Sequence, residues 1–174
     1  MTKSDKLLNA LAKAVSAGGG VHSANELAFM LGVPCDPAFR KFLADSVKKG
    51  LLRRVVRGFY ESKITPPEPE TAIYKIIKKL RSGVLNYISL ESQLSYTGDI
   101  SQVVMGRVTV VTKGRSGCFD TPYGVIEFTH TKKPVEQIAP QLYYDPEIKM
   151  YRAYKEQALA DLKHCRRNLH MLES

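Results

Sequence analysis

A proline-rich stretch after the first third of the chain limits what this sequence can fold into. Residues 65–70 read Thr-Pro-Pro-Glu-Pro-Glu and contain no aliphatic or aromatic side chain that could join a core. Proline fixes φ and pushes the preceding residue toward extended backbone, so neither a helix nor a central strand continues through it. We therefore expect two folding units, residues 1–64 and 71–174, joined by a short stiff linker at 65–70.

The two expected units differ in charge. The 174 residues include 26 Lys and Arg against 17 Asp and Glu, a net charge of +9. Residues 1–64 hold eleven of the basic residues and five of the acidic ones, and therefore most of the excess positive charge. Such an excess favours a polyanionic partner, most often nucleic acid. The charge distribution thus places the expected nucleic-acid-binding site in the N-terminal unit.

Composition argues against several other classes of protein. No apolar run approaches the roughly 20 residues that span a bilayer, and the first nine residues do not read as a secretory signal. Three widely separated cysteines, Cys35, Cys118 and Cys165, match neither a metal site nor a disulfide framework. We expect a cytoplasmic protein without cofactor, metal or membrane partner.

Apolar spacing and capping motifs together predict three helices before the proline-rich stretch. Apolar positions in steps of three and four predict a first helix over residues 4–17. Ser23 and Glu26 form a capping box for a second helix, and Asp36 followed by proline starts a third that ends at Lys49. The tight Gly-Val-Pro turn between the second and third helices predicts a helix-turn-helix.

The third helix and the segment after it carry the residues that we expect to contact DNA. The apolar residues of this helix fall on one face. The opposite face carries small and basic residues together with one acid, and its members are Arg40, Lys41, Ala44, Asp45 and Lys48. Residues 50–61 read as two strands around Arg57-Gly58, the basic hairpin that forms the wing of winged-helix proteins. Arginine and lysine at such places can bond guanine edges or phosphates. The predicted DNA-binding residues are Arg40, Lys41, Lys48, Lys49, Arg53, Arg54 and Arg57.

Residues 71–174 predict a mixed α/β domain, so the expected fold class of the whole chain is α+β. A helix is predicted over residues 70–81, a short strand leading into a helix over 87–98, and β segments around 103–111 and 124–131. Tyrosine, alanine and leucine in steps of three and four predict a long terminal helix over 146–171. Its basic flank is a predicted contact for DNA or an acidic partner and comprises Lys149, Arg152, Lys155 and Arg166.

The order of these motifs resembles the AbiEi family of type IV antitoxins, abortive-infection proteins of mobile elements. The resemblance rests on "GLLRRVVRGFYES", "YISLESQLSYTG", "VTVVTKG" and "YGVIEFTHTK", which follow one another within roughly residues 5–165. It implies a transcriptional repressor that binds inverted repeats in double-stranded DNA at its own promoter. It also implies an antitoxin that counters a nucleotidyltransferase-like toxin.

The residues leave two other functions to be weighed. A metal-dependent nuclease needs two carboxylates on adjacent strands and a lysine two positions after the second. Asp120 and Glu127 supply carboxylates, but Thr129 stands where that lysine should be, so we expect no enzyme. The alternative to an antitoxin is a ligand-sensing winged-helix regulator whose second domain binds a small molecule. No pattern in the sequence locates the polar groups of such a pocket.

Overall fold

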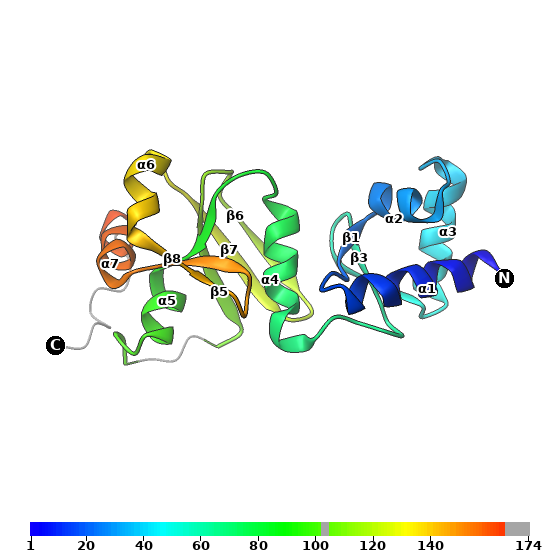
Figure 1. Cartoon of the computed structure of the whole chain (residues 1–174), viewed down its shortest axis with the longest axis horizontal. Coiled ribbons are helices and arrows are strands. Elements are labelled where there is room, and N and C mark those ends of the chain that lie inside the picture. Colours follow the sequence, from blue (N-terminus) through cyan, green and yellow to red (C-terminus); the bar gives the residue numbers. More distant parts are fainter. Residues whose placement is uncertain (102–104, 166–174) are drawn as a thin grey trace. The chain divides into compact units, whose positions relative to one another are not determined.

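The computed structural model describes residues 1–101 and 105–165 and divides into two compact units, Met1–Lys79 and Leu80–Ser174 (Figure 1). Both units combine helices with strands, which confirms the expected α+β class. The division falls after Lys79 and not within the proline-rich stretch, so the first unit is longer than predicted.

Unit 1 begins with three helices whose ends are set by side-chain caps. They are α1 (Lys3–Ser16), α2 (Ala24–Leu31) and α3 (Pro37–Lys48). The Ser23 hydroxyl accepts a hydrogen bond from the backbone N–H of Glu26 at 3.1 Å, and the Glu26 carboxylate accepts one from the Ser23 N–H at 3.2 Å. The Asp36 carboxylate accepts the N–H of Phe39 at 2.9 Å. These caps confirm the three predicted helices.

A three-stranded antiparallel sheet completes the predicted hairpin. Its strands, in the order β1-β3-β2, are β1 (His22–Ser23), β2 (Leu52–Val56) and β3 (Phe59–Ser62). Between β2 and β3 the chain turns at Arg57-Gly58, and Gly58 has φ of 88°. A side chain at that position would be strained, so glycine suits this turn.

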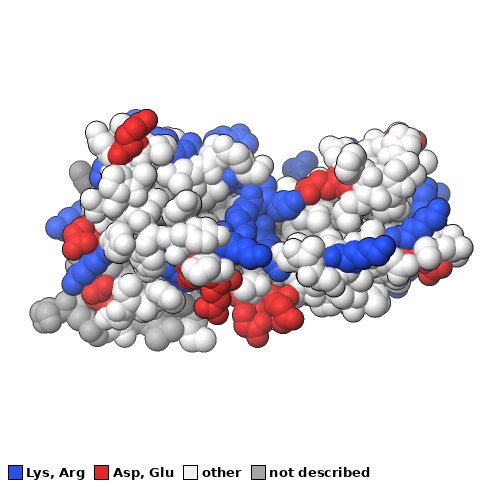
Figure 2. Space-filling view, viewed as in Figure 1, with Lys and Arg blue, Asp and Glu red and all other residues white. Residues whose placement is uncertain are grey.

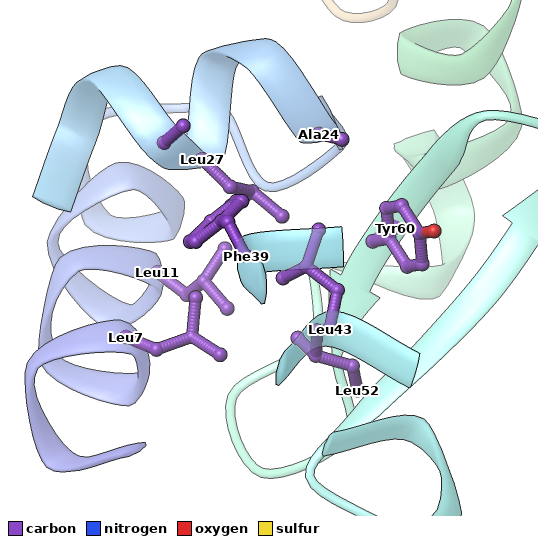
Figure 3. Packing of buried hydrophobic residues seen from close by; sticks show 9 residues of the cluster. Leu7, Leu11, Ala24, Leu27, Phe39, Leu43, Leu52 and Tyr60 are labelled. Carbon is purple, nitrogen blue, oxygen red and sulfur yellow. The ribbon is translucent and has the colours of Figure 1, made fainter. Parts of the chain in front are cut away.

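The helices and the hairpin share one hydrophobic core (Figure 3). Leu7 and Leu11 of α1 meet Leu27 of α2, while Phe39 of α3 is 1% exposed. The hairpin contributes Leu52 and Tyr60 from the other side of this core. Burial of the apolar face of α3 here leaves its basic face at the surface.

The stretch 65–70 is not the separate short stiff linker that the sequence predicts, because it packs against the rest of unit 1. The Ser62 hydroxyl accepts hydrogen bonds from two backbone N–H groups that follow it, at 3.1 and 2.9 Å. Pro67 is buried, and a Cβ added to Gly20 would lie only 3.2 Å from it. The helix α4 (Pro69–Leu80) then starts inside the stretch, because proline is well tolerated in the first turn of a helix.

Unit 2 is built on a six-stranded mixed sheet in the order β6-β7-β5-β4-β9-β8. The strands are β4 (Asn86–Ile88), β5 (Arg107–Thr112), β6 (Gly117–Thr121), β7 (Gly124–His130), β8 (Leu142–Asp145) and β9 (Met150–Ala153). The pairs β4–β9 and β5–β7 are parallel, and the other pairs are antiparallel. The predicted strands at 87–88, 107–111 and 124–130 are thereby confirmed.

Helices pack on this sheet around a second core. They are α5 (Leu90–Tyr96), α6 (Val135–Ile138) with a 3-10 turn (Ala139–Gln141), and α7 (Lys155–His164). Leu94 of α5, Val111 of β5 and Leu162 of α7 are among the buried side chains of this core. The helix predicted after the strand at residue 87 is therefore confirmed as α5, and the one predicted over 70–81 as α4.

The predicted long helix over residues 146–171 is wrong in its first part. Met150–Ala153 form β9, which pairs with β8, and α7 starts only at Lys155. From Ile148 to Arg152 the side chains alternate between buried and exposed, the period of two of a strand. The part of this prediction beyond Cys165, and the predicted β residues Val103 and Val104, lie outside the described residues.

Candidate nucleic-acid interface

The outer face of α3 is mainly small and basic. The Phe39, Leu43 and Ser46 side chains point into the unit and are nearly inaccessible. The exposed positions of the helix after its first residue are Ala38, Arg40, Lys41, Ala44 and Lys48, and Asp45 on the same face is partly exposed. A face of this kind lets the helix approach a surface closely and offers cationic donors along its length.

Packing holds α3 in place from behind. The rings of Phe39 and Phe42 lie 5.9 Å apart, and the ammonium of Lys3 from α1 lies 5.2 Å from the Phe42 ring. At the other end of α3, Lys48 and Lys49 stand where cations stabilise the partial negative charge of a helix C-terminus. These two lysines therefore have a structural role besides any contact with DNA.

The three predicted arginines of the hairpin differ in their exposure and in the side chains that they contact. Arg53 is bound across the strands, because its Nε donates to Oε1 of the buried Glu61 at 2.8 Å. Arg54 is exposed and lies over the ring of Tyr60, with its guanidinium carbon 5.6 Å from the ring centroid. Arg57 is exposed at the turn. Two of the three arginines are thus available to a ligand, and Arg53 mainly fixes the hairpin.

Basic side chains are also visible elsewhere on unit 1. Figure 2 shows Lys and Arg lying over α1 and near the N-terminus on the face in view. The predicted residues Arg40, Lys41, Lys48, Lys49, Arg54 and Arg57 are all exposed in this unit. Together they supply donors for phosphate and base edges, and the partly exposed Asp45 is the one acid among them on α3.

The second predicted contact set is not one surface. Arg152 is only 5% exposed, so the prediction that it lies on a solvated basic flank is wrong. Lys149 is exposed in the turn between β8 and β9, and Lys155 forms an ion pair with Asp99 at 3.2 Å. Arg166 lies outside the described residues. Because β9 replaces the start of the expected helix, these side chains do not follow one helical face.

Arg152 instead stabilises the sheet edge. Its Nε donates to Oδ2 of Asp145 at 2.7 Å, its Nη1 donates to Oε1 of Gln93 at 3.0 Å, and its guanidinium stacks 3.7 Å from the Tyr96 ring. The hydrogen bond from Arg152 lowers the pKa of the Asp145 carboxyl below its ordinary value of 3.8. The side chain thereby connects β9 to both β8 and α5.

We expect Arg152→Ala to lower the free energy of unfolding of unit 2 by about 3 kcal/mol, because Asp145 loses its cation in a largely buried place. Since the pKa of Asp145 is lowered in the folded protein, this stabilisation is present above about pH 4 and fades as the pH falls through the folded pKa. Urea denaturation of both proteins between pH 3 and 7 measures it. Lys149→Ala is the exposed control and should change stability by less than about 0.5 kcal/mol. Equal effects of the two substitutions would contradict the assignment.

Of the two carboxylates considered for a metal-dependent nuclease, one is already bound by an arginine. Glu127 of β7 accepts a hydrogen bond from Arg107 at 2.7 Å, while Asp120 of β6 is exposed opposite Val125. Within residues 1–101 and 105–165, no three His, Cys, Asp or Glu side chains are grouped to hold a metal ion. In the same residues, no helix is long and apolar enough to cross a membrane.

Sequence reasoning missed a buried polar cluster in unit 2. Asp161 of α7 accepts hydrogen bonds from the hydroxyls of Tyr87 at 2.9 Å and Ser89 at 2.7 Å. Tyr87 and Ser89 belong to the "YISLESQLSYTG" motif, but Asp161 is more than seventy positions away along the chain. No local pattern marks it, because an aspartate in a basic helix reads as an ordinary exposed residue.

Comparisons with known proteins give a fold and no family. No family model and no curated protein matches the chain. Among solved structures, the crystal structure of RV2827C protein from Mycobacterium tuberculosis is similar, with a TM-score of 0.53 and 14% sequence identity. The match covers 95% of this chain and 53% of that chain, so this chain spans about half the length of that protein. At such low identity the similarity concerns the fold alone.

Proposed function

We propose that unit 1 is a winged-helix domain that binds double-stranded DNA, with α3 as the recognition helix and the β2–β3 hairpin as the wing. The observation that carries the proposal is the outward face of α3, whose exposed side chains after the first residue are alanine, arginine and lysine, with the partly exposed Asp45 as its one acid. The major groove admits one α-helix, and alanines permit close approach while arginine and lysine reach base edges and phosphates. The protein would act by occupying DNA, not by catalysis.

The arrangement around α3 supports this proposal. The α2 and α3 helices are joined by residues 32–36, and Gly32 adopts φ of 68° to end α2. A short helix-turn-helix of this kind positions its second helix against DNA. The exposed Arg54 and Arg57 at the far end of the hairpin suit contacts with the DNA backbone.

An arginine of the wing and the arginine of α3 should affect DNA binding in different ways when each is replaced by alanine. We expect Arg57→Ala to weaken binding to all sequences about equally and to reduce the slope of log affinity against log salt by about one. Arg40→Ala should instead reduce the preference for a specific site by about 1–3 kcal/mol if it contacts a base. Fluorescence anisotropy with the duplex upstream of the gene and a scrambled duplex, at several salt concentrations, separates the two effects.

Lys63→Ala is the control for both variants, because Lys63 is exposed and follows the last strand of the sheet. It should leave the salt slope and the preference for the upstream duplex close to those of the unaltered protein. A control variant as weak as Arg57→Ala would show that net charge, and not the wing, sets affinity.

Repression of its own promoter and antitoxin activity are proposals that rest on the resemblance to the AbiEi family. Two assays test them separately. A reporter behind the upstream promoter should be repressed by the intact protein and derepressed by the Arg40→Ala variant. Growth should be restored when the protein is expressed with a nucleotidyltransferase-like toxin from the adjacent gene. Repression without rescue would leave the protein as a regulator of the ligand-sensing or another type.

A further inference from the structure

A cavity of about 250 Å³ lies in unit 2 between the end of β7, the loop that follows it and one face of α7. The polar groups that decide what it can hold are Thr129, Lys132, Lys133, Asp161 and His164. A concave site with a few convergent polar groups beside apolar ones, here Val111 and Ala160, is the usual form of a small-molecule site.

Asp161 is the single acidic side chain among the described residues that line the cavity, and its carboxylate is already satisfied. Oδ2 accepts the Tyr87 and Ser89 hydroxyls, and Oδ1 accepts Nε2 of Gln157 at 2.9 Å. Burial raises the pKa of Asp161 despite these neutral donors. The acid is therefore bound within the protein by three neutral donors, and Lys133 is close enough to lower its pKa in part.

The donors of the cavity, in contrast, are in excess. Lys133 Nζ makes one hydrogen bond of 3.2 Å, to Oε1 of Gln157. Within the described part of the chain, the side chains of Thr129, Lys132 and His164 have no hydrogen-bond or ion-pair partner. Two lysines, a threonine and a histidine thus line one small space, and their side chains have unused capacity to donate.

The loop that carries the two lysines is held in place before any ligand arrives. Lys113 of the segment after β5 donates from Nζ to the carbonyl oxygens of Thr131 and Lys133, both at 3.0 Å. The Thr131 hydroxyl also accepts the backbone N–H of Lys133 at 3.2 Å. A loop fixed in this way loses little conformational entropy on binding, which favours affinity.

We propose that this cavity binds the phosphate group of a small molecule. Ammonium and hydroxyl donors are the groups with which proteins hold phosphate oxygens, and the excess of cationic side chains over one internally bonded acid favours an anion. A volume of about 250 Å³ admits a phosphate with a small attached group. The site belongs to unit 2 and uses none of the residues proposed to contact DNA, so it adds a ligand to that function.

The test uses the full-length protein and three probes: inorganic phosphate, glycerol 3-phosphate and glycerol. Thermal unfolding is followed by calorimetry at constant ionic strength, with chloride replacing the probe. We expect both phosphate compounds to raise the unfolding temperature of unit 2 in a saturable manner and glycerol at the same concentration to leave it unchanged, because only a ligand of the folded state stabilises it. A lower Kd for glycerol 3-phosphate would identify an organic phosphate as the ligand, and an equal or higher Kd would identify free phosphate. No saturable shift with either phosphate compound would overturn the proposal.

Matched variants locate the binding. Replacing Lys132 and Lys133 by alanine should raise the Kd for phosphate at least tenfold, while the same change at Lys149 and Lys163, which are exposed and do not line the cavity, should leave it unchanged. Thr129→Val keeps the side-chain shape and should raise the Kd several-fold, which covers the case in which the double variant folds poorly. If phosphate binding survives the Lys132 and Lys133 changes but is lost with Arg40→Ala, the anion binds the DNA face and the cavity is not a phosphate site.

Discussion

Replacing Arg40, Lys41 and Lys48 together by glutamate is expected to reduce affinity for the upstream duplex several hundredfold at 0.1 M salt. All three side chains are on the exposed face of α3. Each phosphate contact that releases a counterion contributes about a factor of eight at this salt concentration, so loss of the two lysine contacts gives roughly sixtyfold. Loss of the base contact of Arg40, about 1–3 kcal/mol, contributes at least about a further fivefold. Repulsion between glutamate and DNA adds to the loss. Anisotropy titrations at 50–200 mM salt measure both the affinity and a salt slope reduced by about two.

The control for this variant has the same change in charge at a different place. Replacing Lys6, Lys13 and Lys63 by glutamate also lowers the net charge by six, and all three lysines are exposed in unit 1. Both variants should remain folded, because exposed charges contribute little to stability. We expect the control to lose less than about tenfold in affinity. Equal losses in the two variants would mean that binding depends on the charge of the whole domain and that α3 does not enter the groove.

Phe39→Ala is expected to lower the free energy of unfolding of unit 1 by about 3–5 kcal/mol. Phe39 is 1% exposed and lies among Leu7, Leu27 and Leu43 in the core (Figure 3). Removing the ring costs its transfer free energy and leaves a cavity that neighbouring side chains fill only in part. For a domain of this size the unfolding temperature should fall by more than about 10 °C, which calorimetry can measure as a shift of one transition.

Phe29 of α2 provides the control, because its ring is 87% exposed. Phe29→Ala makes the same chemical change within the same unit and should alter stability by less than about 0.5 kcal/mol. The Phe39→Ala variant should also lose DNA binding, since α3 is held by this core, whereas Phe29→Ala should keep it. A similar loss of stability in both variants would contradict the packing described for α3.

The elements of unit 1 were predictable because their limits are encoded locally. The capping pairs Ser23 with Glu26 and Asp36 with Phe39 lie three residues apart, and the structure contains both. The hairpin turn was visible as Arg57-Gly58 between two β-rich runs. What the sequence did not reveal was the length of the unit. Prolines read as a break in secondary structure, but they do not show that Pro67 is buried.

Unit 2 was less predictable because its strands are paired over long distances. A run with apolar residues in steps of three and four read as helix, although the chain around Met150 forms the strand β9 between β4 and β8. The basic residue Arg152 read as solvated, since burial of an arginine depends on partners, here Asp145 and Gln93, that only the folded sheet brings near. The cavity beside Asp161 was invisible for the same reason.

The parallel pairing of β4 with β9 also affects the order in which the parts of the chain can fold during synthesis. Tyr87 of β4 pairs with Tyr151 of β9, so this part of the sheet cannot form until residue 151 has left the ribosome. All elements of unit 1 have emerged long before. At about 5–20 residues per second, the remaining residues take roughly 5–20 s to synthesise. During that interval all elements of unit 1 are already available to fold, while β4 still lacks its partner β9.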